Sequence, residues 1–188
     1  MLFSILIPSL KSRMNQLIDL KLNLYQQIIA CNAINDIEII TETDNGEMSI
    51  GAKRNKLLER AAGKYLCSID DDDTPSSTYI SKLLDCIKTK CDNCSLMGII
   101  TWDGNNPELF EHSIKYKEYR TNDTGTIKYE RYPNHLNVIR TDIAKQFKFP
   151  NLNHGEDTDF APQIFNSGLL KNETKIEGVI YHYNFKTK

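Results

Sequence analysis

Four consecutive aspartates, Asp70 to Asp73, are the residues of this 188-residue chain best suited to chemistry. They follow residues 64–69, a short apolar segment with the pattern of a buried strand. Adjacent carboxylates repel one another, so the cluster needs a cation or solvent to compensate its charge. Side chains alternate along an extended backbone, so Asp70 and Asp72 would point the same way and could share Mg²⁺ or Mn²⁺. The alternative is an acidic loop that only caps the next helix.

A second acidic pair, Glu156 and Asp157, follows His154 and Gly155. Acidic residues favour the first turn of a helix through the helix dipole alone, so ordinary helix chemistry would explain the pair. The functional interpretation is that one carboxylate acts as a general base and takes a proton from an incoming hydroxyl group.

Strand and helix patterns alternate through the first hundred residues, and these elements must position the acidic groups. The predicted strands are residues 2–8, 37–41, 64–69 and 95–102, and the predicted helices are residues 14–31, 49–62 and 75–90. This alternation is typical of βαβ units in a largely parallel sheet, where ligands bind outside the carboxyl ends of the strands. We therefore expect residues 8–13, 42–46 and 70–73 to share one rim of the sheet.

The pattern changes after Trp102, where turn residues and tyrosines become frequent. We expect short strands at residues 114–119 and 126–131, helices at 141–147 and from 154 to about 166, and a last strand at 175–183. The chain contains no internal repeat and no low-complexity linker, so residues 1–188 are predicted to form one domain with two functional halves.

The order of these motifs resembles that of the GT-A glycosyltransferases, and of family 2 in particular. The resemblance is carried, in chain order, by a first strand ending in Pro8 and Ser9, by Glu42 and Asp44, by Gly51-Ala52-Lys53-Arg54-Asn55, by Gly63-Lys64-Tyr65-Leu66, by Asp70 and Asp72, by Glu156 and Asp157, and by His182. It implies an α/β fold of the GT-A type, with a Rossmann-like, mostly parallel central sheet flanked by helices. Residues 1–102 would bind the nucleotide sugar, and residues 103–188 would bind the acceptor and supply the catalytic base.

The resemblance also implies a role for each matching residue. The donor would be bound by Pro8, Ser9, Glu42, Asp44, Arg54, Asp70 and Asp71, with Asp70 on the ribose and either Glu42 or Asp44 on the nucleobase. Asp72 would ligate Mn²⁺ or Mg²⁺ on the diphosphate, with His182 as a further metal ligand. Asp157 would be the base of an inverting transfer, and Glu156 would help to place the acceptor.

The expected activity is therefore transfer of a sugar from a nucleotide diphosphate, with a UDP-sugar as the expected donor, to a hydroxyl group of a glycan. A cation would neutralise the departing diphosphate, and a separate carboxylate would deprotonate the acceptor. A sugar-nucleotide nucleotidyltransferase is an alternative, although residues 9–13 lack the glycines of a triphosphate loop. A non-catalytic sugar-binding or metal-binding module is another. Lipid-linked sugars and proteins stay open as acceptors.

Composition narrows the class of protein and its compartment. The net charge of −2 argues against a strongly basic nucleic-acid binder and makes a nucleic-acid acceptor less expected. The chain has no signal-peptide pattern and no apolar stretch long enough to span a membrane, so we expect a cytoplasmic protein. Five cysteines, an odd number, favour reduced thiols over a disulfide framework.

Several other residues have two interpretations. Cys86, Cys91 and Cys94 have a spacing suggestive of zinc but no evident fourth ligand. His112 and His135 are expected at the surface or in loops. Trp102 and the tyrosines between residues 116 and 132 suit either sugar binding or packing.

Overall fold

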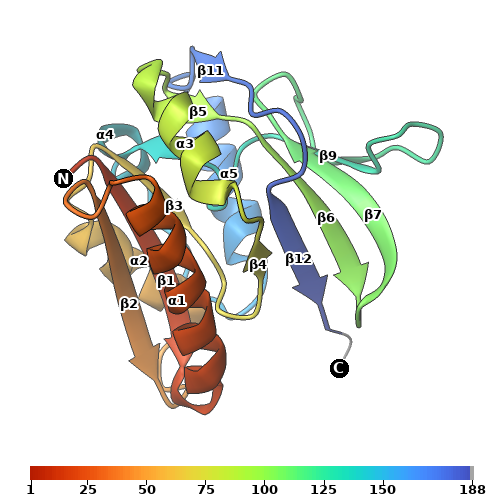
Figure 1. Cartoon of the computed structure of the whole chain (residues 1–188). Helices are drawn as coiled ribbons and strands as arrows, with labels where there is room; N and C mark the ends of the chain where they lie inside the picture. The colour runs from red at the N-terminus through yellow and green to blue at the C-terminus, as the bar shows by residue number, and fades with distance from the viewer. Residues whose placement is uncertain (187–188) are drawn as a thin grey trace.

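Two six-stranded sheets stand side by side in the computed structural model, which describes residues 1–186 (Figure 1). The first sheet has the order β11-β5-β10-β3-β1-β2, and the second has the order β4-β12-β6-β7-β9-β8. The strands of the first sheet are β1 (Phe3–Leu10), β2 (Ile37–Asp44), β3 (Tyr65–Ser68), β5 (Asn93–Cys94), β10 (Ile139–Arg140) and β11 (Glu173–Thr174). Those of the second are β4 (Thr74–Pro75), β6 (Leu96–Trp102), β7 (Asn105–His112), β8 (Arg120–Thr121), β9 (Tyr129–Arg131) and β12 (Tyr181–Phe185).

The parallel arrangement predicted for the start of the chain is confirmed, although each complete sheet is mixed. Strand β1 pairs in parallel with β2 on one side and with β3 on the other. Strand β10 joins β3 antiparallel, and β7 joins β6 antiparallel. The three polar segments expected on one rim therefore do lie at the carboxyl ends of neighbouring parallel strands.

Helices cover both faces of the first sheet: α1 (Met14–Ala30), α2 (Ile50–Arg60), α3 (Tyr79–Lys88), α4 (Thr141–Ala144) and α5 (Glu156–Asn166). Because side chains alternate along β1, Phe3, Ile5 and Ile7 pack against α1 and α3, while Leu6 packs against α2 and α5. None of the helices within residues 1–186 is long and apolar enough to cross a membrane.

A β-hairpin after Trp102 was not predicted from the sequence. Strands β6 and β7 pair antiparallel and are joined by Asp103 and Gly104, whose φ angles are 49° and 77°. Two consecutive positive φ angles match the two-residue turn that joins hairpin strands, and an Asp-Gly pair is its usual sequence. The Asp-Gly pair was therefore the sequence signal for this hairpin. Residues 105–112 form the strand β7, where the sequence analysis expected a segment rich in turns.

The strands predicted after residue 102 differ in position from those in the structure. Residues 114–119 contain no strand, the segment predicted at 126–131 is β9 alone, and the last strand begins at Tyr181 rather than at residue 175. Strands β10 and β11 lie beyond residue 102 yet pair within the first sheet. The two sequence halves are thus interleaved in space. Residues 187 and 188 of the predicted domain lie outside the described residues.

The expectation of five reduced thiols was wrong at two positions. Cys86, on α3, and Cys94, on β5, form a disulfide, while Cys31, Cys67 and Cys91 are free. The buried Cys91 sulfur lies 3.7 Å from the Cys86 sulfur and 3.8 Å from the Cys94 sulfur. The turn between α3 and β5 brings all three together, a contact that spacing alone does not reveal.

Gly51 sets the distance between α2 and the segment that leads into α5. A Cβ atom added at Gly51 would collide with the carbonyl oxygen of Pro150, and the Gly51 N–H donates to the carbonyl of Leu152 at 3.1 Å. We expect Gly51→Ala to lower the free energy of unfolding in urea by about 2 kcal/mol, because the helix and this segment must move apart. Glu59→Ala, on the exposed face of α2, is the control and should change it by less than about 0.5 kcal/mol. Equal values for the two variants would contradict this packing argument.

Candidate active site

The carboxyl ends of β1 and β3 are joined by ion pairs at the predicted rim. The buried Asp71 carboxylate accepts hydrogen bonds from the Ser9 hydroxyl at 2.6 Å and from Arg13 Nη1 at 2.8 Å. The same Arg13 nitrogen lies 3.0 Å from Asp72. The side chain of Asp72 is 19% exposed, so it can still meet a ligand, whereas Asp71 is engaged within the protein.

Lys53 ties the end of β2 to β1. Its buried ammonium forms an ion pair with Asp44 and donates to the carbonyl of Ser9 at 2.6 Å. Asp44 also accepts from the backbone N–H groups of Gly46 and Met48, so its carboxylate shapes the turn that follows β2. Glu42, the other candidate for the nucleobase, pairs with the exposed cations Lys56 and Arg60.

Asp44 should make folding stability depend on acid pH. Burial alone would raise the pKa of Asp44, but the hydrogen bonds from Lys53, Met48 and Gly46 outweigh it and lower that pKa to about 2. The folded state therefore holds the ionised carboxylate more strongly than the unfolded chain, and this stabilisation is complete above the ordinary pKa of 3.8. This stabilisation is lost as the pH falls from 3.8 through the folded-state pKa of about 2.

We expect the free energy of unfolding of the wild-type protein to fall more steeply between pH 4 and pH 2 than that of Asp44→Asn. Urea denaturation at several pH values measures both slopes. Identical slopes would contradict the assigned role of the Lys53 ion pair.

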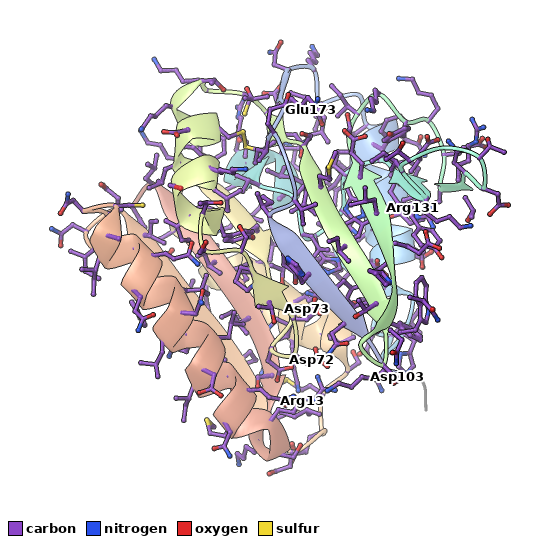
Figure 2. All side chains as sticks on the ribbon, turned by 45° about the vertical axis from the view of Figure 1, so that its right-hand side comes forward. Arg13, Asp72, Asp73, Asp103, Arg131 and Glu173 are labelled. Carbon is purple, nitrogen blue, oxygen red and sulfur yellow. A yellow bond between two sulfur atoms is a disulfide. The ribbon has the colours of Figure 1, made fainter. Side chains whose placement is uncertain are left out.

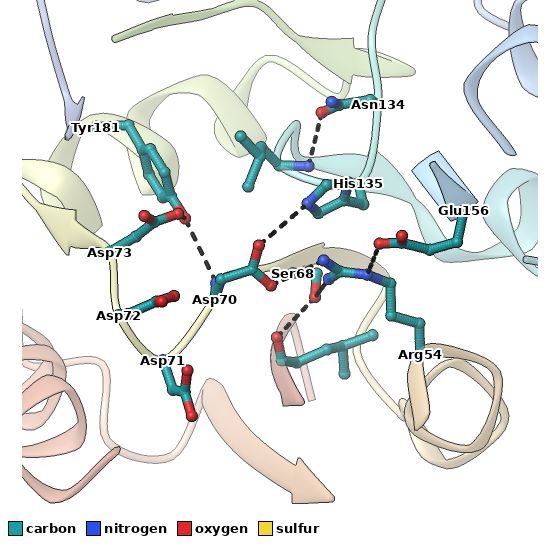
Figure 3. A network of polar contacts seen from close by, with 12 residues as sticks. Arg54, Ser68, Asp70, Asp71, Asp72, Asp73, Asn134, His135, Glu156 and Tyr181 are labelled. Carbon is teal, nitrogen blue, oxygen red and sulfur yellow. Dashed lines mark hydrogen bonds and ion pairs between the residues drawn. The ribbon is translucent and has the colours of Figure 1, made fainter. Parts of the chain in front are cut away.

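Arg54 connects the two acidic groups that the sequence singled out (Figure 3). The side chain of this α2 residue is 2% exposed and donates from all three of its nitrogens. Nε bonds to Glu156 at 3.0 Å, Nη1 to the Ser68 hydroxyl at 2.7 Å, and Nη2 to Asp70 at 2.8 Å. The charge of Arg54 holds the pKa of Asp70 far below its usual value, although burial acts in the opposite direction. Asp70 therefore stays ionised beside a cation that also binds Glu156.

Asp73 links the aspartate turn to the second sheet. Its buried carboxylate lies beside the Tyr181 hydroxyl (Figure 3), from which it accepts a hydrogen bond at 2.7 Å, and it also accepts from the Asn184 N–H at 3.1 Å. Burial, followed by the charge of Asp70, raises the pKa of Asp73 well above its ordinary value. The structure thus gives the fourth aspartate a bracing role that the sequence did not indicate.

A cavity of about 510 Å³ lies between the aspartate turn, the start of α5 and one face of the second sheet. Asp70, Asp73, Arg54, Glu156 and Asp157 all line it. Because side chains alternate, every second residue of the sheet strands faces the cavity: Ile100, Trp102, Phe110, His112, Tyr129, Arg131, Tyr183 and Phe185. The volume is typical of small-molecule sites, and Trp102 and Tyr129 pack with ring centroids 5.9 Å apart.

The acidic pair at the start of α5 is divided between two environments. Glu156 is 5% exposed and is held by Arg54, whereas Asp157 is half-buried and lines the cavity. Within residues 1–186, no side chain hydrogen-bonds to the carboxylate of Asp157. The geometry therefore leaves Asp157 available to a ligand, whereas Glu156 is held within the protein by its ion pair with Arg54.

The structure places the three histidines in different ways. His182 is exposed and pairs with Ile99 on one side and with Thr74, the residue after the aspartate turn, on the other. Its side chain lies on the sheet face opposite the cavity, which Tyr183 lines, so its role as a metal ligand stays a prediction. His135 lies in a loop, as expected, and His112 lies on β7; both are buried and line the cavity.

His135 approaches the first aspartate of the turn. Its Nε2 lies 3.8 Å from Asp70 (Figure 3), and its backbone carbonyl accepts from the Ser68 N–H at 2.8 Å. Burial lowers the pKa of His112 to about 3, and the neighbouring His135 and Arg131 act in the same direction. No sequence signal placed these histidines here, because each depends on a long-range pairing of strands or loops.

The structure brings the predicted site residues into two connected groups. Arg54, Asp70, Glu156 and Asp157 line the cavity. Pro8, Ser9, Glu42, Asp44, Asp71 and Asp72 lie at or beside the neighbouring strand ends. Two cations bridge these strand ends: Lys53, named from the sequence only as part of the residue 51–55 motif, and Arg13, which the sequence analysis did not single out.

The charge balance at this edge suits a divalent cation. Five carboxylates, those of Asp44, Asp70, Asp71, Asp72 and Glu156, form ion pairs with the three basic side chains Arg13, Lys53 and Arg54. Burial raises the pKa of Asp72, and the charges of Asp70 and Asp71 act in the same direction, against the charge of Arg13. Among the described residues, the only close group of three metal-ligand side chains is Cys86, Cys91 and Cys94, so Asp72 would share an ion with ligand phosphates rather than hold it alone.

Solved structures with related folds support this architecture. The chain matches S. aureus TarS residues 1–349 in complex with UDP-GlcNAc, with a TM-score of 0.64, 17% identity, and coverage of 100% of this chain and 60% of that chain. It matches the catalytic domain of Drosophila beta1,4galactosyltransferase 7, in complex with xylobiose, with a TM-score of 0.58, 12% identity, and coverage of 96% and 70%. At these identities the likeness is one of fold, and the fold is GT-A, as the motif order implied.

Sequence comparison gives the family. No curated protein sequence matches the chain. The model of glycosyl transferase family 2 matches residues 25–148, which include β2, β3 and the aspartate turn but not Glu156, Asp157 or His182. From this match over more than half of its length, the chain belongs to glycosyl transferase family 2.

Proposed function

We propose that the protein is an inverting, metal-dependent glycosyltransferase that moves a sugar from a UDP-sugar to a hydroxyl group of a glycan. The observation that carries this proposal is the cavity, which is lined both by residues of the aspartate turn and by Asp157, whose carboxylate no described side chain hydrogen-bonds. A transfer with inversion needs charge stabilisation at the leaving diphosphate and a base on the opposite face of the sugar. Membership of glycosyl transferase family 2 supports the same reaction class.

The donor would lie along the carboxyl ends of β1, β2 and β3. Asp70 would accept hydrogen bonds from the ribose, because its carboxylate lines the cavity and Arg54 keeps it ionised. Pro8 and Ser9 would border the nucleobase, with Glu42 or Asp44 nearby. Asp71 would act indirectly, by fixing Ser9 and Arg13. The solved TarS structures that contain UDP-GlcNAc and UDP support a UDP-sugar as the donor.

A divalent cation, Mn²⁺ or Mg²⁺, would be held by Asp72 together with the diphosphate oxygens of the donor. When bound, it supplies the positive charge that stabilises the leaving diphosphate. Arg13 lies 3.0 Å from Asp72 and would keep that carboxylate oriented.

The acceptor would enter between α5 and the second sheet. Asp157 would take the proton from its attacking hydroxyl group, while Glu156 and Arg54 keep the start of α5 in place. Residues 1–102 would thus supply the donor side of the cavity, and later residues the acceptor side.

Donor turnover tests this proposal. Incubation with UDP-GlcNAc, UDP-glucose or UDP-galactose and Mn²⁺ should release UDP, and EDTA should suppress the release. NMR of the transferred or hydrolysed sugar should show inversion at the anomeric carbon. Release of pyrophosphate from UTP and a sugar phosphate would instead identify a nucleotidyltransferase, and no turnover of any nucleotide sugar would point to a non-catalytic module.

A further inference from the structure

Arg131 is a cation in the cavity that no carboxylate neutralises. It lies at the end of β9, on the sheet face that lines the cavity, and is half-buried. Within residues 1–186, no Asp or Glu oxygen forms an ion pair with its guanidinium, although the neighbouring Arg120 pairs with Glu130. Burial lowers the pKa of Arg131, against the phenol groups of Tyr119 and Tyr129. A half-buried charge of this kind is costly unless a ligand compensates it.

The guanidinium is held in a fixed position without a counter-ion. Nη1 donates to the carbonyls of Arg120 at 2.6 Å and Glu130 at 2.9 Å. The central carbon lies 4.8 Å from the ring centroid of Tyr119 and 5.3 Å from that of Tyr129. In the described part of the chain, the hydrogen bonds of Arg131 all come from Nη1, which leaves Nε and Nη2 for an anion. A planar guanidinium presented in this way suits a carboxylate or a phosphate.

Unpartnered ring nitrogens continue from Arg131 along the same wall. His112 is paired with Arg131 across β7 and β9, is 6% exposed, and its Nδ1 has no hydrogen-bond partner among the described residues. His135, which is 9% exposed, likewise has no hydrogen bond at Nδ1 there, while its Nε2 faces Asp70 at 3.8 Å. Buried polar groups are normally hydrogen-bonded, so these nitrogens indicate that the wall is completed by a polar ligand.

The position of Arg131 assigns this ligand to the acceptor side of the cavity. Figure 2 shows Arg131 apart from Asp72 and Asp73, with β12, β6 and β7 between them. Asp157 and Arg131 both influence the pKa of Tyr119, whereas none of the four aspartates of the turn acts on Arg131. The cation thus lies on the side of the proposed base, and Arg13 is the cation beside Asp72.

From these contacts we infer that the acceptor is an acidic glycoside, with a carboxylate or phosphate group that binds Arg131 and His112 while its hydroxyl group faces Asp157. Trp102 and Tyr129, on the same wall, would contact the sugar ring. This inference rests on the proposed function, since it names the substrate class of the same cavity.

The fluorescence of Trp102 provides a direct binding test, because it is the only tryptophan in the chain. The protein, with UDP and Mn²⁺ present, is titrated at one ionic strength with methyl β-glucoside, methyl β-glucuronide and methyl β-glucoside 6-phosphate. At least one acidic glycoside should bind about tenfold or more tightly than the neutral glycoside, as expected for charge-assisted hydrogen bonds. The glucuronide and the phosphate separate the two possible sources of the anionic group.

Variants assign the preference to Arg131. Arg131→Gln should bring the affinities for acidic and neutral glycosides to within about threefold, whereas Arg131→Lys should keep most of the preference. Arg120→Gln is the matched control, since it removes a neighbouring arginine whose side chain is 61% exposed, and it should match the wild type. If Arg131→Gln fails to fold, the inference is still tested by the preference of the wild type for acidic glycosides and by its retention in Arg131→Lys.

Equal affinity for all three glycosides, no binding of any of them, or an unchanged preference in Arg131→Gln would overturn the inference. A parallel calorimetric titration with UDP and Mn²⁺ separates this failure from a failure of the proposed function. If UDP binds and the acidic preference is absent, only the inference is wrong. If UDP does not bind, the proposed function itself is wrong.

Discussion

Asp157→Asn is expected to lower the kcat of sugar transfer by about 10³-fold and to leave donor affinity within about threefold of the wild type. Asparagine has the same shape as aspartate but cannot take a proton from the acceptor hydroxyl. The two acids of this pair lie in different surroundings, because Glu156 is bound to Arg54 whereas Asp157 lines the cavity. Steady-state kinetics of UDP release with an acceptor, together with calorimetric titration of UDP, measures both quantities.

Asp159→Asn is the control for this experiment. Asp159 lies in the same first turn of α5 but is exposed, so the variant makes the same chemical change outside the cavity. Its kcat should stay within about twofold of the wild type. Equal losses of activity in the two variants would show that the charge of the turn matters and that Asp157 is not the base.

Removal of the Arg54 guanidinium should have the largest effect on stability. We expect Arg54→Met to lower the free energy of unfolding in urea by about 3–5 kcal/mol, because Glu156 and Asp70 lose their shared buried cation. Sugar transfer should fall as well, since the Arg54–Glu156 bond holds the start of α5 beside the cavity.

Two further variants show whether the effect comes from unpaired charge. Lys56→Met, on the exposed face of α2, breaks a surface ion pair with Glu42 and should cost less than about 1 kcal/mol. Adding Glu156→Gln to Arg54→Met should restore part of the lost stability, because one uncompensated carboxylate is removed. A double variant no more stable than Arg54→Met would contradict the charge-balance explanation.

The acidic edge was predictable because it depends on local patterns. Short apolar runs alternate with helix patterns, and parallel strands place their carboxyl ends at one edge, so Asp44, Asp70 and Asp72 could be assigned to one rim. Arg54 could be recognised as a candidate, but its bonds to both Glu156 and Asp70 join residues 102 and 16 positions away. Such contacts follow from tertiary packing and have no local signature.

The histidines show what a local sequence pattern does not determine. Whether a strand residue faces the cavity or the other face depends on register, and a shift of one residue reverses the answer. His182 lies on the far face for this reason, while Tyr183 lines the cavity. His112 and Arg131 face the cavity through the pairing of β7 with β9, a parallel pair that the unpredicted β6–β7 hairpin positions.

Calorimetric titration of UDP tests the central claim, that the aspartate turn binds a nucleotide diphosphate through a divalent cation. We predict that UDP binds about tenfold or more tightly in Mn²⁺ than in EDTA, and that Asp72→Asn removes this difference. Asp85→Asn, at an acid on α3 that is 73% exposed, should bind UDP as the wild type does. UDP affinity that is undetectable, or equal with and without Mn²⁺ in both the wild type and Asp72→Asn, would contradict the account.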